Sequence, residues 1–165
     1  MTGSDAVGRH VGEVAGKSLK MSVLELGSND AYVVLEDANV ALAVNTCVQG
    51  RLYDNGETCV SAKRFVVIKA VYEGSVGASV EQMQAITMGE PTADETQLGL
   101  LASKEQFDTL SGQVTRSIAG GASLLCGGVL AEALGYHFSA TVLVNCQPGT
   151  PADDDELFKP AASII

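Results

Sequence analysis

A single cysteine, Cys59, follows a Gly-Glu-Thr turn in the stretch RLYDNGETCVSAKR, and two cations come one turn of chain later. A cysteine in this setting is either a nucleophile or a buried thiol that packs as a small apolar side chain. The two histidines, His10 and His137, lie far from Cys59 in the sequence. The sequence therefore favours a carboxylate over an imidazole as the base of any cysteine chemistry.

Glu25 is the candidate for that base. It interrupts the apolar stretch MSVLELG just before a glycine turn. Burial at such a position would raise the pKa of the carboxylate toward the working range of a general base. The alternative is a glutamate at a strand end that faces solvent.

The N-terminal stretch TGSDAVG places Gly3, Ser4 and Gly8 where a helix is expected to begin. Backbone N–H groups and a hydroxyl at a helix start are suited to binding a phosphate. No strand precedes this stretch in the sequence, so the pattern alone does not identify a nucleotide site.

Composition limits the classes of protein and partner. The chain has 165 residues, 46% of them hydrophobic and 18% charged, which is typical of one globular domain. A net charge of -10 argues against nucleic acid and anionic membranes as partners. There is no apolar run long enough to span a bilayer and no export signal. The four cysteines form neither a disulfide framework nor a zinc motif, so we expect free thiols, no metal site and a cytoplasmic protein.

Helical and strand patterns alternate along the chain, which predicts an α/β domain with a largely parallel sheet. We expect Asp37 to cap the second helix. The acidic stretch ADDDELF could begin a further short helix. The expected helices cover 3–20, 37–53, 71–86 and 103–119, and the expected strands cover 21–26, 31–35, 64–68, 122–126 and 141–145.

Taken in order, these stretches resemble the central part of the NAD(P)-dependent aldehyde dehydrogenase superfamily over essentially all 165 residues. TGSDAVG is similar to the family's phosphate-side glycine motif, LELGSND to its E-L-G-G motif, and NGETC to its G-Q-x-C nucleophile motif. GEPTADETQLGLLAS resembles the family's G-x-P … L-G-P-x linker, ATVLVN its P-P-T-V-L strand, and DELFKPAASII its E-E-x-F-G-P-V segment.

The resemblance implies an aldehyde dehydrogenase-like catalytic domain, a mostly parallel sheet flanked by helices, that is truncated. Residues 1–25 would be a remnant of the coenzyme-binding domain, comprising its phosphate-side helix and strand, and residues 26–165 an incomplete catalytic domain. The elements that hold the adenosine would lie outside this chain. We expect exposed strand edges to favour a homo-oligomer or self-association.

The resemblance also implies roles for individual residues. Cys59 would be the nucleophile that forms a thiohemiacetal and then a thioester, and Glu25 would activate the water that hydrolyses the thioester. Glu156 would bind the hydroxyls of the nicotinamide ribose. The coenzyme-binding residues implied for NAD or NADP are Gly3, Ser4, Gly8, Leu26, Glu156 and Phe158.

The implied activity is oxidation of a small aldehyde to the carboxylic acid. LGSND is nearest to the corresponding stretch of succinate-semialdehyde-type members, so a short carboxylated aldehyde is the expected substrate. We expect the isolated chain to be weakly active or inactive. Two alternatives stay open: a non-catalytic α/β module that uses its exposed edges for assembly, and a thioesterase or esterase that uses Cys59 and Glu25.

Three departures from the family pattern lie in the site itself. Ser28 replaces the second glycine of E-L-G-G, so a backbone with positive φ would be strained there. Glu57 replaces the glutamine two residues before Cys59, and Lys159 replaces the glycine after Phe158. These changes suggest a diverged member of the family.

Overall fold

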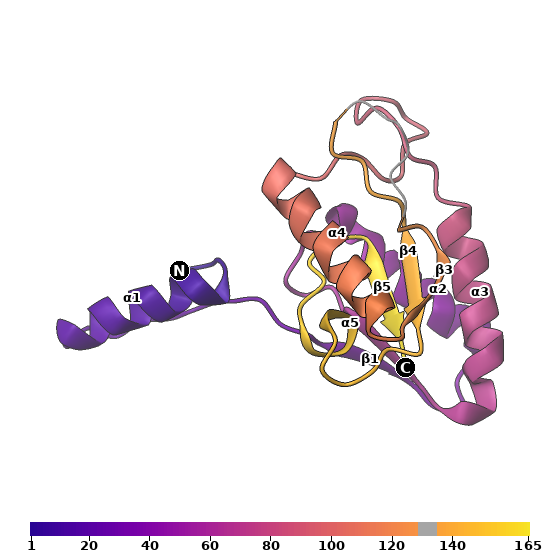
Figure 1. The fold of residues 1–165 in the computed structure, drawn as a ribbon, viewed down its shortest axis with the longest axis horizontal. Coiled ribbons are helices and arrows are strands. Elements are labelled where there is room, and N and C mark those ends of the chain that lie inside the picture. The colour runs from indigo at the N-terminus through magenta and orange to yellow at the C-terminus, as the bar shows by residue number, and fades with distance from the viewer. Residues whose placement is uncertain (129–134) are drawn as a thin grey trace.

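Figure 1 shows the computed structural model, which describes residues 1–128 and 135–165. Five short strands form one sheet in the order β1-β2-β5-β4-β3. Three of the four strand pairings are parallel, and only β3 runs antiparallel to its neighbour β4. The prediction of a largely parallel α/β sheet is therefore confirmed. The strands are β1 (Ala31–Val34), β2 (Arg64–Val67), β3 (Ser123–Cys126), β4 (Thr141–Val144) and β5 (Ala161–Ile164).

Helices cover both faces of the sheet. In Figure 1, α4 (Lys104–Ala119) and α5 (Pro151–Asp154) lie on the near face, while α2 (Val40–Leu52) and α3 (Tyr72–Gln84) lie on the other. Side chains alternate between the two faces along each strand. On β4, for example, Val142 and Val144 pack in the core with α2 and α3, and Leu143 packs in the core with α4 and α5.

Two central strands carry the buried core of the sheet. Every residue of β4 and β5 is buried. The prediction included β4 but no strand at 161–164, because Ala-Ala-Ser lacks the β-branched and aromatic residues that mark a strand. Small side chains fit there because β5 lies between β2 and β4 and under helices on both sides.

The first helix, α1 (Asp5–Lys17), projects away from the sheet (Figure 1). The segment that follows it returns beside the N-terminus, where Thr2 and Glu25 form a single parallel bridge. The predicted strand at 21–26 is wrong, because this isolated bridge, with one hydrogen bond from the Met1 ammonium to the Val23 carbonyl, does not extend into a strand among the described residues. Leu19 and Met21 are 95% and 99% exposed. No helix in the described ranges is long and apolar enough to cross a membrane.

Helix ends follow local side-chain chemistry. Ser103 caps α4 by accepting a hydrogen bond from the Gln106 N–H, and Gly120 ends that helix as predicted. Asp37 was predicted to cap α2, but Asn39 does so by accepting from the Leu42 N–H at 3.1 Å. The chain makes a turn before Asn39, which places Asp37 outside the helix. Two short 3₁₀ helices complete the described elements, η1 (Tyr53–Gly56) and η2 (Lys69–Val71).

Because Asn39 and not Asp37 caps α2, substitution of these two residues should affect stability differently. We expect Asn39→Ala to lower the free energy of unfolding by about 1 kcal/mol, because the Leu42 N–H loses its acceptor. Asp37→Ala is the matched control and should change it by less than about 0.5 kcal/mol. Urea unfolding followed by circular dichroism measures both. Equal losses in the two variants would contradict the assignment of the cap.

Candidate active site

Cys59 lies in the turn between η1 and β2 with its side chain exposed. The other cysteines, Cys47, Cys126 and Cys146, are buried free thiols. Burial raises the pKa of Cys47 to about 11 and also raises the pKa values of Cys126 and Cys146. The role of a buried small side chain thus applies to these three thiols, and Cys59 is the thiol that a reagent can reach.

A buried lysine holds the backbone of Cys59. Lys63 is fully buried, and its Nζ donates a hydrogen bond to the Cys59 carbonyl at 2.9 Å. The same Nζ lies 3.0 Å from Oε1 of Glu156 in an ion pair. That Oε1 also accepts from the Ser28 N–H at 3.2 Å, and the Ser28 hydroxyl lies 3.4 Å from the Cys59 carbonyl. The turn of the candidate nucleophile is therefore tied to two distant segments.

Backbone strain lies at different residues from the one predicted. The positive φ expected at Ser28 is wrong, and in η1 Asp54 and Asn55 adopt φ of 51° and 55° instead. Asn and Asp tolerate this conformation better than most side chains.

Gly27, which precedes Ser28, lies very close to Glu156. A Cβ at Gly27 would lie 1.8 Å from Oε2 of Glu156, so a larger residue there would displace that carboxylate.

Glu57 and Lys159 form a second ion pair beside Cys59. Oε1 of Glu57 lies 2.6 Å from Nζ of Lys159, and the two side chains are 15% and 4% exposed. Burial lowers the pKa of Lys159, and the Glu57 carboxylate opposes that shift. The two departures from the family pattern thus contact each other.

Further cations lie beneath the turn. Arg51 is fully buried and donates to the carbonyls of Gly56 at 2.6 Å and Ala62 at 3.2 Å. Burial lowers its pKa to about 10, while Glu156 acts in the opposite direction. The ammonium groups of Lys63 and Lys159 both lie over the ring of Phe158, 5.9 Å and 4.9 Å from its centroid.

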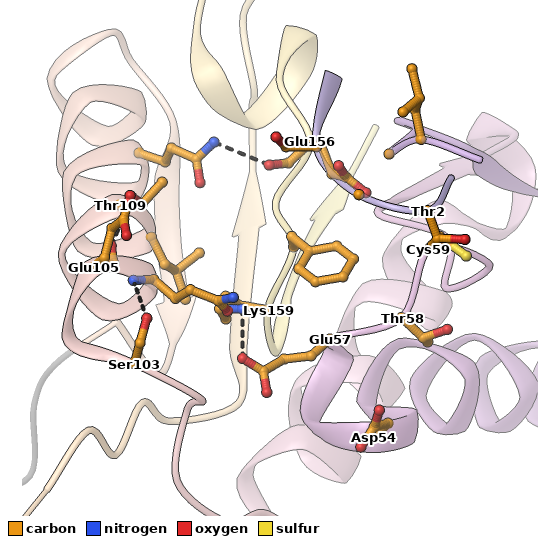
Figure 2. Close-up of a pocket in the computed structure, with 18 of the residues that line it drawn as sticks. Thr2, Asp54, Glu57, Thr58, Cys59, Ser103, Glu105, Thr109, Glu156 and Lys159 are labelled. Atoms are coloured by element: carbon orange, nitrogen blue, oxygen red, sulfur yellow. Dashed lines mark hydrogen bonds and ion pairs between the residues drawn. The ribbon is translucent and has the colours of Figure 1, made fainter. Parts of the chain in front are cut away.

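A cavity of about 650 Å³ opens beside Cys59. In Figure 2, Thr2 and Cys59 lie on one side of it, Ser103, Glu105 and Thr109 of α4 lie opposite, and Lys159 and Glu57 lie between them. Seven residues predicted for the site line this cavity: Gly3, Ser4, Glu25, Leu26, Cys59, Glu156 and Phe158.

Gly8 lies outside the cavity lining. It is the buried residue of α1, and a Cβ there would lie 2.5 Å from Cδ2 of Leu26. Its missing side chain lets α1 pack closely against Leu26. Ser4 is the N-cap of α1, with Oγ accepting from the Val7 N–H at 3.4 Å. The Gly3 N–H donates to the Glu25 carbonyl at 3.0 Å, which joins the helix start to the Glu25 segment.

Glu25 shares the cavity with Cys59 but is exposed. This exposure matches the alternative left open by the sequence, a glutamate that faces solvent, and not a buried base. Its segment bonds only to residues 1–3 at the N-terminus within the described residues, through an isolated bridge and not a strand. Glu25 is therefore accessible to water at the cavity wall.

Several lining residues were not predicted from the sequence. Gln113 lines the cavity and was not singled out, although its Nε2 donates to the Glu156 carbonyl at 3.1 Å. Lys63, which lies beneath the turn and outside the lining, was noted only as one of two cations after Cys59. Gln106, Thr109 and Gln113 share one face of α4. A polar helix face is usually predicted to face solvent. Only the folded structure, which places this face across the cavity from Cys59, shows that it belongs to the site. The α4 side of the lining consists of Ser103, Glu105, Gln106, Thr109, Leu110 and Gln113.

The donor set suits an organic coenzyme better than a metal. Oε1 of Glu156 is engaged by Lys63 and Ser28, while Oε2 has no partner within the described residues and can accept a hydroxyl. Phe158 offers an apolar surface in the same cavity. The described ranges contain no group of three or more side chains placed to hold a metal ion.

Comparison with known proteins gives one consistent family. The family described as "Aldehyde dehydrogenase family" matches residues 1–165. Succinate-semialdehyde dehydrogenase [NADP(+)] 1 of Mycobacterium ulcerans is 38% identical over 164 residues, which are 99% of this chain and 36% of that protein. A related enzyme of Mycolicibacterium paratuberculosis is 37% identical, over 99% of this chain and 35% of its own. The chain thus spans about a third of the length of these curated relatives.

Solved structures agree. Lactaldehyde dehydrogenase from Escherichia coli superposes with a TM-score of 0.96 at 30% identity, over 100% of this chain and 35% of that chain. An NAD+ complex of aldehyde dehydrogenase from Bacillus cereus gives a TM-score of 0.96 at 29% identity, over 99% of this chain and 33% of its own. The fold around the cavity is therefore shared with these enzymes.

The buried ion pair predicts a large loss on removal of one partner. We expect Lys63→Met to lower the free energy of unfolding by about 2–4 kcal/mol, because Glu156 keeps its charge without a counterion; its partial exposure places the loss toward the low end for buried pairs. Lys17→Met is the control, since the Lys17–Glu13 pair is 71% and 59% exposed and should cost less than about 1 kcal/mol. Similar urea midpoints for the two variants would contradict a structural role for Lys63.

Proposed function

The chain belongs to the aldehyde dehydrogenase family, and on that basis we propose that the protein oxidises an aldehyde to its carboxylic acid with NAD or NADP as hydride acceptor. One observation carries the proposal. The accessible thiol, Cys59, opens into the same cavity as Glu25, Glu156 and Phe158, which come from distant parts of the sequence. Those are the residues to which the family resemblance assigns the chemistry.

Cys59 acts as the nucleophile in this proposal. Its thiolate adds to the aldehyde carbon, and the carbonyl oxygen takes up the negative charge as the oxyanion of a thiohemiacetal. The Cys59 N–H donates to no acceptor within the described residues, so it is available to the developing oxyanion. Loss of hydride from the former aldehyde carbon leaves a thioester on Cys59.

Glu25 completes the cycle. Its carboxylate takes a proton from a water molecule, which attacks the thioester carbon. The carbon–sulfur bond breaks, releasing the carboxylic acid and the free thiol. The exposure of Glu25 at the cavity wall supports this role, since the attacking water can reach the carboxylate.

The coenzyme is held on the side of the cavity formed by Glu156 and Phe158. Glu156 would accept hydroxyls of the nicotinamide ribose with its free Oε2, and Phe158 would contact the apolar ring. Gly3, Ser4 and the start of α1 would face the pyrophosphate. When bound, the nicotinamide supplies the site with a two-electron acceptor for the hydride.

A short aldehyde that carries a carboxylate, such as succinate semialdehyde, is the proposed substrate. Two observations support it. The turn LGSND is nearest to that of succinate-semialdehyde-type members, and succinate-semialdehyde dehydrogenases are among the curated relatives at 36–38% identity.

We also propose that the protein is a cytoplasmic homo-oligomer or self-associates. All four cysteines are free thiols, as in a reducing compartment. Strands β1 and β3 are the two edges of the sheet, and Val33 of β1 and Leu125 of β3 are 64% and 41% exposed. Unpaired edges with apolar side chains favour association.

Iodoacetamide at a limiting amount tests the nucleophile directly. We expect Cys59 to be alkylated before the other three thiols, because they are buried and burial raises their pKa values. Peptide mass mapping after short exposure gives the order. Preferential labelling of Cys47, Cys126 or Cys146 would count against the assignment.

Aldehyde-dependent reduction of NAD or NADP tests the reaction and separates the two roles. We expect Cys59→Ser to lower the rate by at least about a thousandfold. Glu25→Gln should keep one rapid turnover and slow the steady state by about a hundredfold or more, because only thioester hydrolysis needs the base. Glu13→Gln, an exposed glutamate on α1, should change neither.

The comparison of aldehydes decides between the proposed function and the alternatives. Succinate semialdehyde should be oxidised with a higher kcat/KM than an uncharged aldehyde of similar length. Absence of reduction with every aldehyde, together with no preferential alkylation of Cys59, would favour a non-catalytic module, and ester hydrolysis without reduction would favour a thioesterase.

A further inference from the structure

Glu57 links three segments that are far apart in sequence. Oε1 of Glu57 lies 2.6 Å from Nζ of Lys159, just before β5, and accepts from the Ala102 N–H at 3.2 Å, just before α4. Glu57 is itself two residues before Cys59. A single carboxylate oxygen therefore joins the turn of the thiol to the starts of a helix and a strand.

The residues before Glu57 reinforce the same junction. The Asn55 side chain donates to the Leu100 carbonyl at 3.2 Å and accepts from the Gly99 N–H at 2.9 Å. Gly56 approaches the backbone of Lys159 so closely that a Cβ would lie 2.6 Å from the Lys159 carbonyl carbon. The turn therefore packs against both segments, which places the Lys159 ammonium within ion-pair distance of Glu57.

Charge makes the two partners depend on each other. Lys159 is 3% exposed, and its ammonium faces Glu57 from the turn, Arg51 from α2 and Glu156 from its own segment. The ammonium of Lys63 lies over the same Phe158 ring. An ammonium buried without a counterion is strongly destabilising. A carboxylate at Glu57 without Lys159 would leave an uncompensated negative charge at the cavity wall that Cys59 shares, where it opposes the thiolate.

We propose that Glu57 and Lys159 are a positioning pair for Cys59, in which each residue compensates the other and together they hold the turn of the thiol and balance the charge beside it. The two departures from the family pattern are then one coupled change. The inference rests on the proposed role of Cys59 as the nucleophile.

The pH profile of Cys59 alkylation by iodoacetamide tests the electrostatic part. We expect Lys159→Met to move the midpoint of the profile up by about half a unit to one unit, because the carboxylate remains without its cation. Glu57→Gln should move it down by a similar amount, because the cation remains alone. The double variant should return close to the unsubstituted protein.

Urea unfolding of the same proteins tests the coupling. We expect each single substitution to lower the unfolding midpoint, and the double variant to lower it less than either single, as contacting residues in one ion pair are non-additive. The control is the pair Lys104–Asp108, which has the same 2.6 Å separation but side chains that are 69% and 54% exposed. Lys104→Met and Asp108→Asn should leave both the alkylation profile and the unfolding midpoint nearly unchanged.

Each outcome has one meaning. A double variant less stable than both singles would overturn the coupling, and unchanged alkylation profiles in the singles would overturn the effect on Cys59. If Glu57→Gln does not fold, Lys159→Met and the double variant decide the question. If Cys59 is not the first thiol alkylated in the unsubstituted protein, the proposed function is contradicted. If Cys59 is alkylated first but its pH profile does not change in the Glu57 and Lys159 variants, only this inference is contradicted.

Discussion

The ion pair between Lys63 and Glu156 is the interaction on which the site depends. Lys63 is fully buried, so its charge is tolerated only because Glu156 and the Cys59 carbonyl surround it. Lys63 immediately precedes β2, and Glu156 lies in the segment that leads into β5. Because β2 and β5 are hydrogen-bonded neighbours, the pairing of two strands also sets the place of the thiol and of the carboxylate expected to bind ribose.

The five charged side chains packed beneath the turn of Cys59 carry a net charge opposite in sign to that of the chain. The sequence carries a net charge of -10, yet the groups packed beneath the turn are three cations, Arg51, Lys63 and Lys159, and two carboxylates, Glu57 and Glu156. The cations are almost entirely buried, so solvent screens them less than the surface acids. The carboxylates therefore serve mainly as counterions to buried lysines, which gives the acidic replacement at Glu57 a structural reason.

The sequence predicted most of the sheet, and seven of the expected site residues line one cavity, for reasons that differ by residue. Strands such as β2 and β4 are rich in β-branched residues, which mark a strand. Cys59 and Glu156 lie in short motifs that can be recognised from their neighbours in sequence. The ion pairs were not predictable, because Glu57 and Lys159 are joined only by the fold, and each alone suggested divergence. Whether Glu25 is buried or faces solvent stayed open, because burial depends on what covers a segment, which local sequence does not record. Strand β5 was missed because its small residues have low strand propensity, and they form a strand only because β2 and β4 lie on either side of them.

The position of β5 has a consequence for how the molecule assembles. β5 lies between β2 and β4, and it is the last of the five strands along the chain. During synthesis, the pairs β1–β2 and β3–β4 can form early, but no strand pairing joins them until residues 161–164 leave the ribosome. Before that, α3 can already pack against α2 and against β3 and β4, so it is the pairing of the strands that waits for β5. This pairing spans a long stretch of chain, and contacts of this kind are slow to form. The counterions of Lys63 and of Glu57 arrive with the same segment, so the thiol turn acquires its final environment only as folding ends.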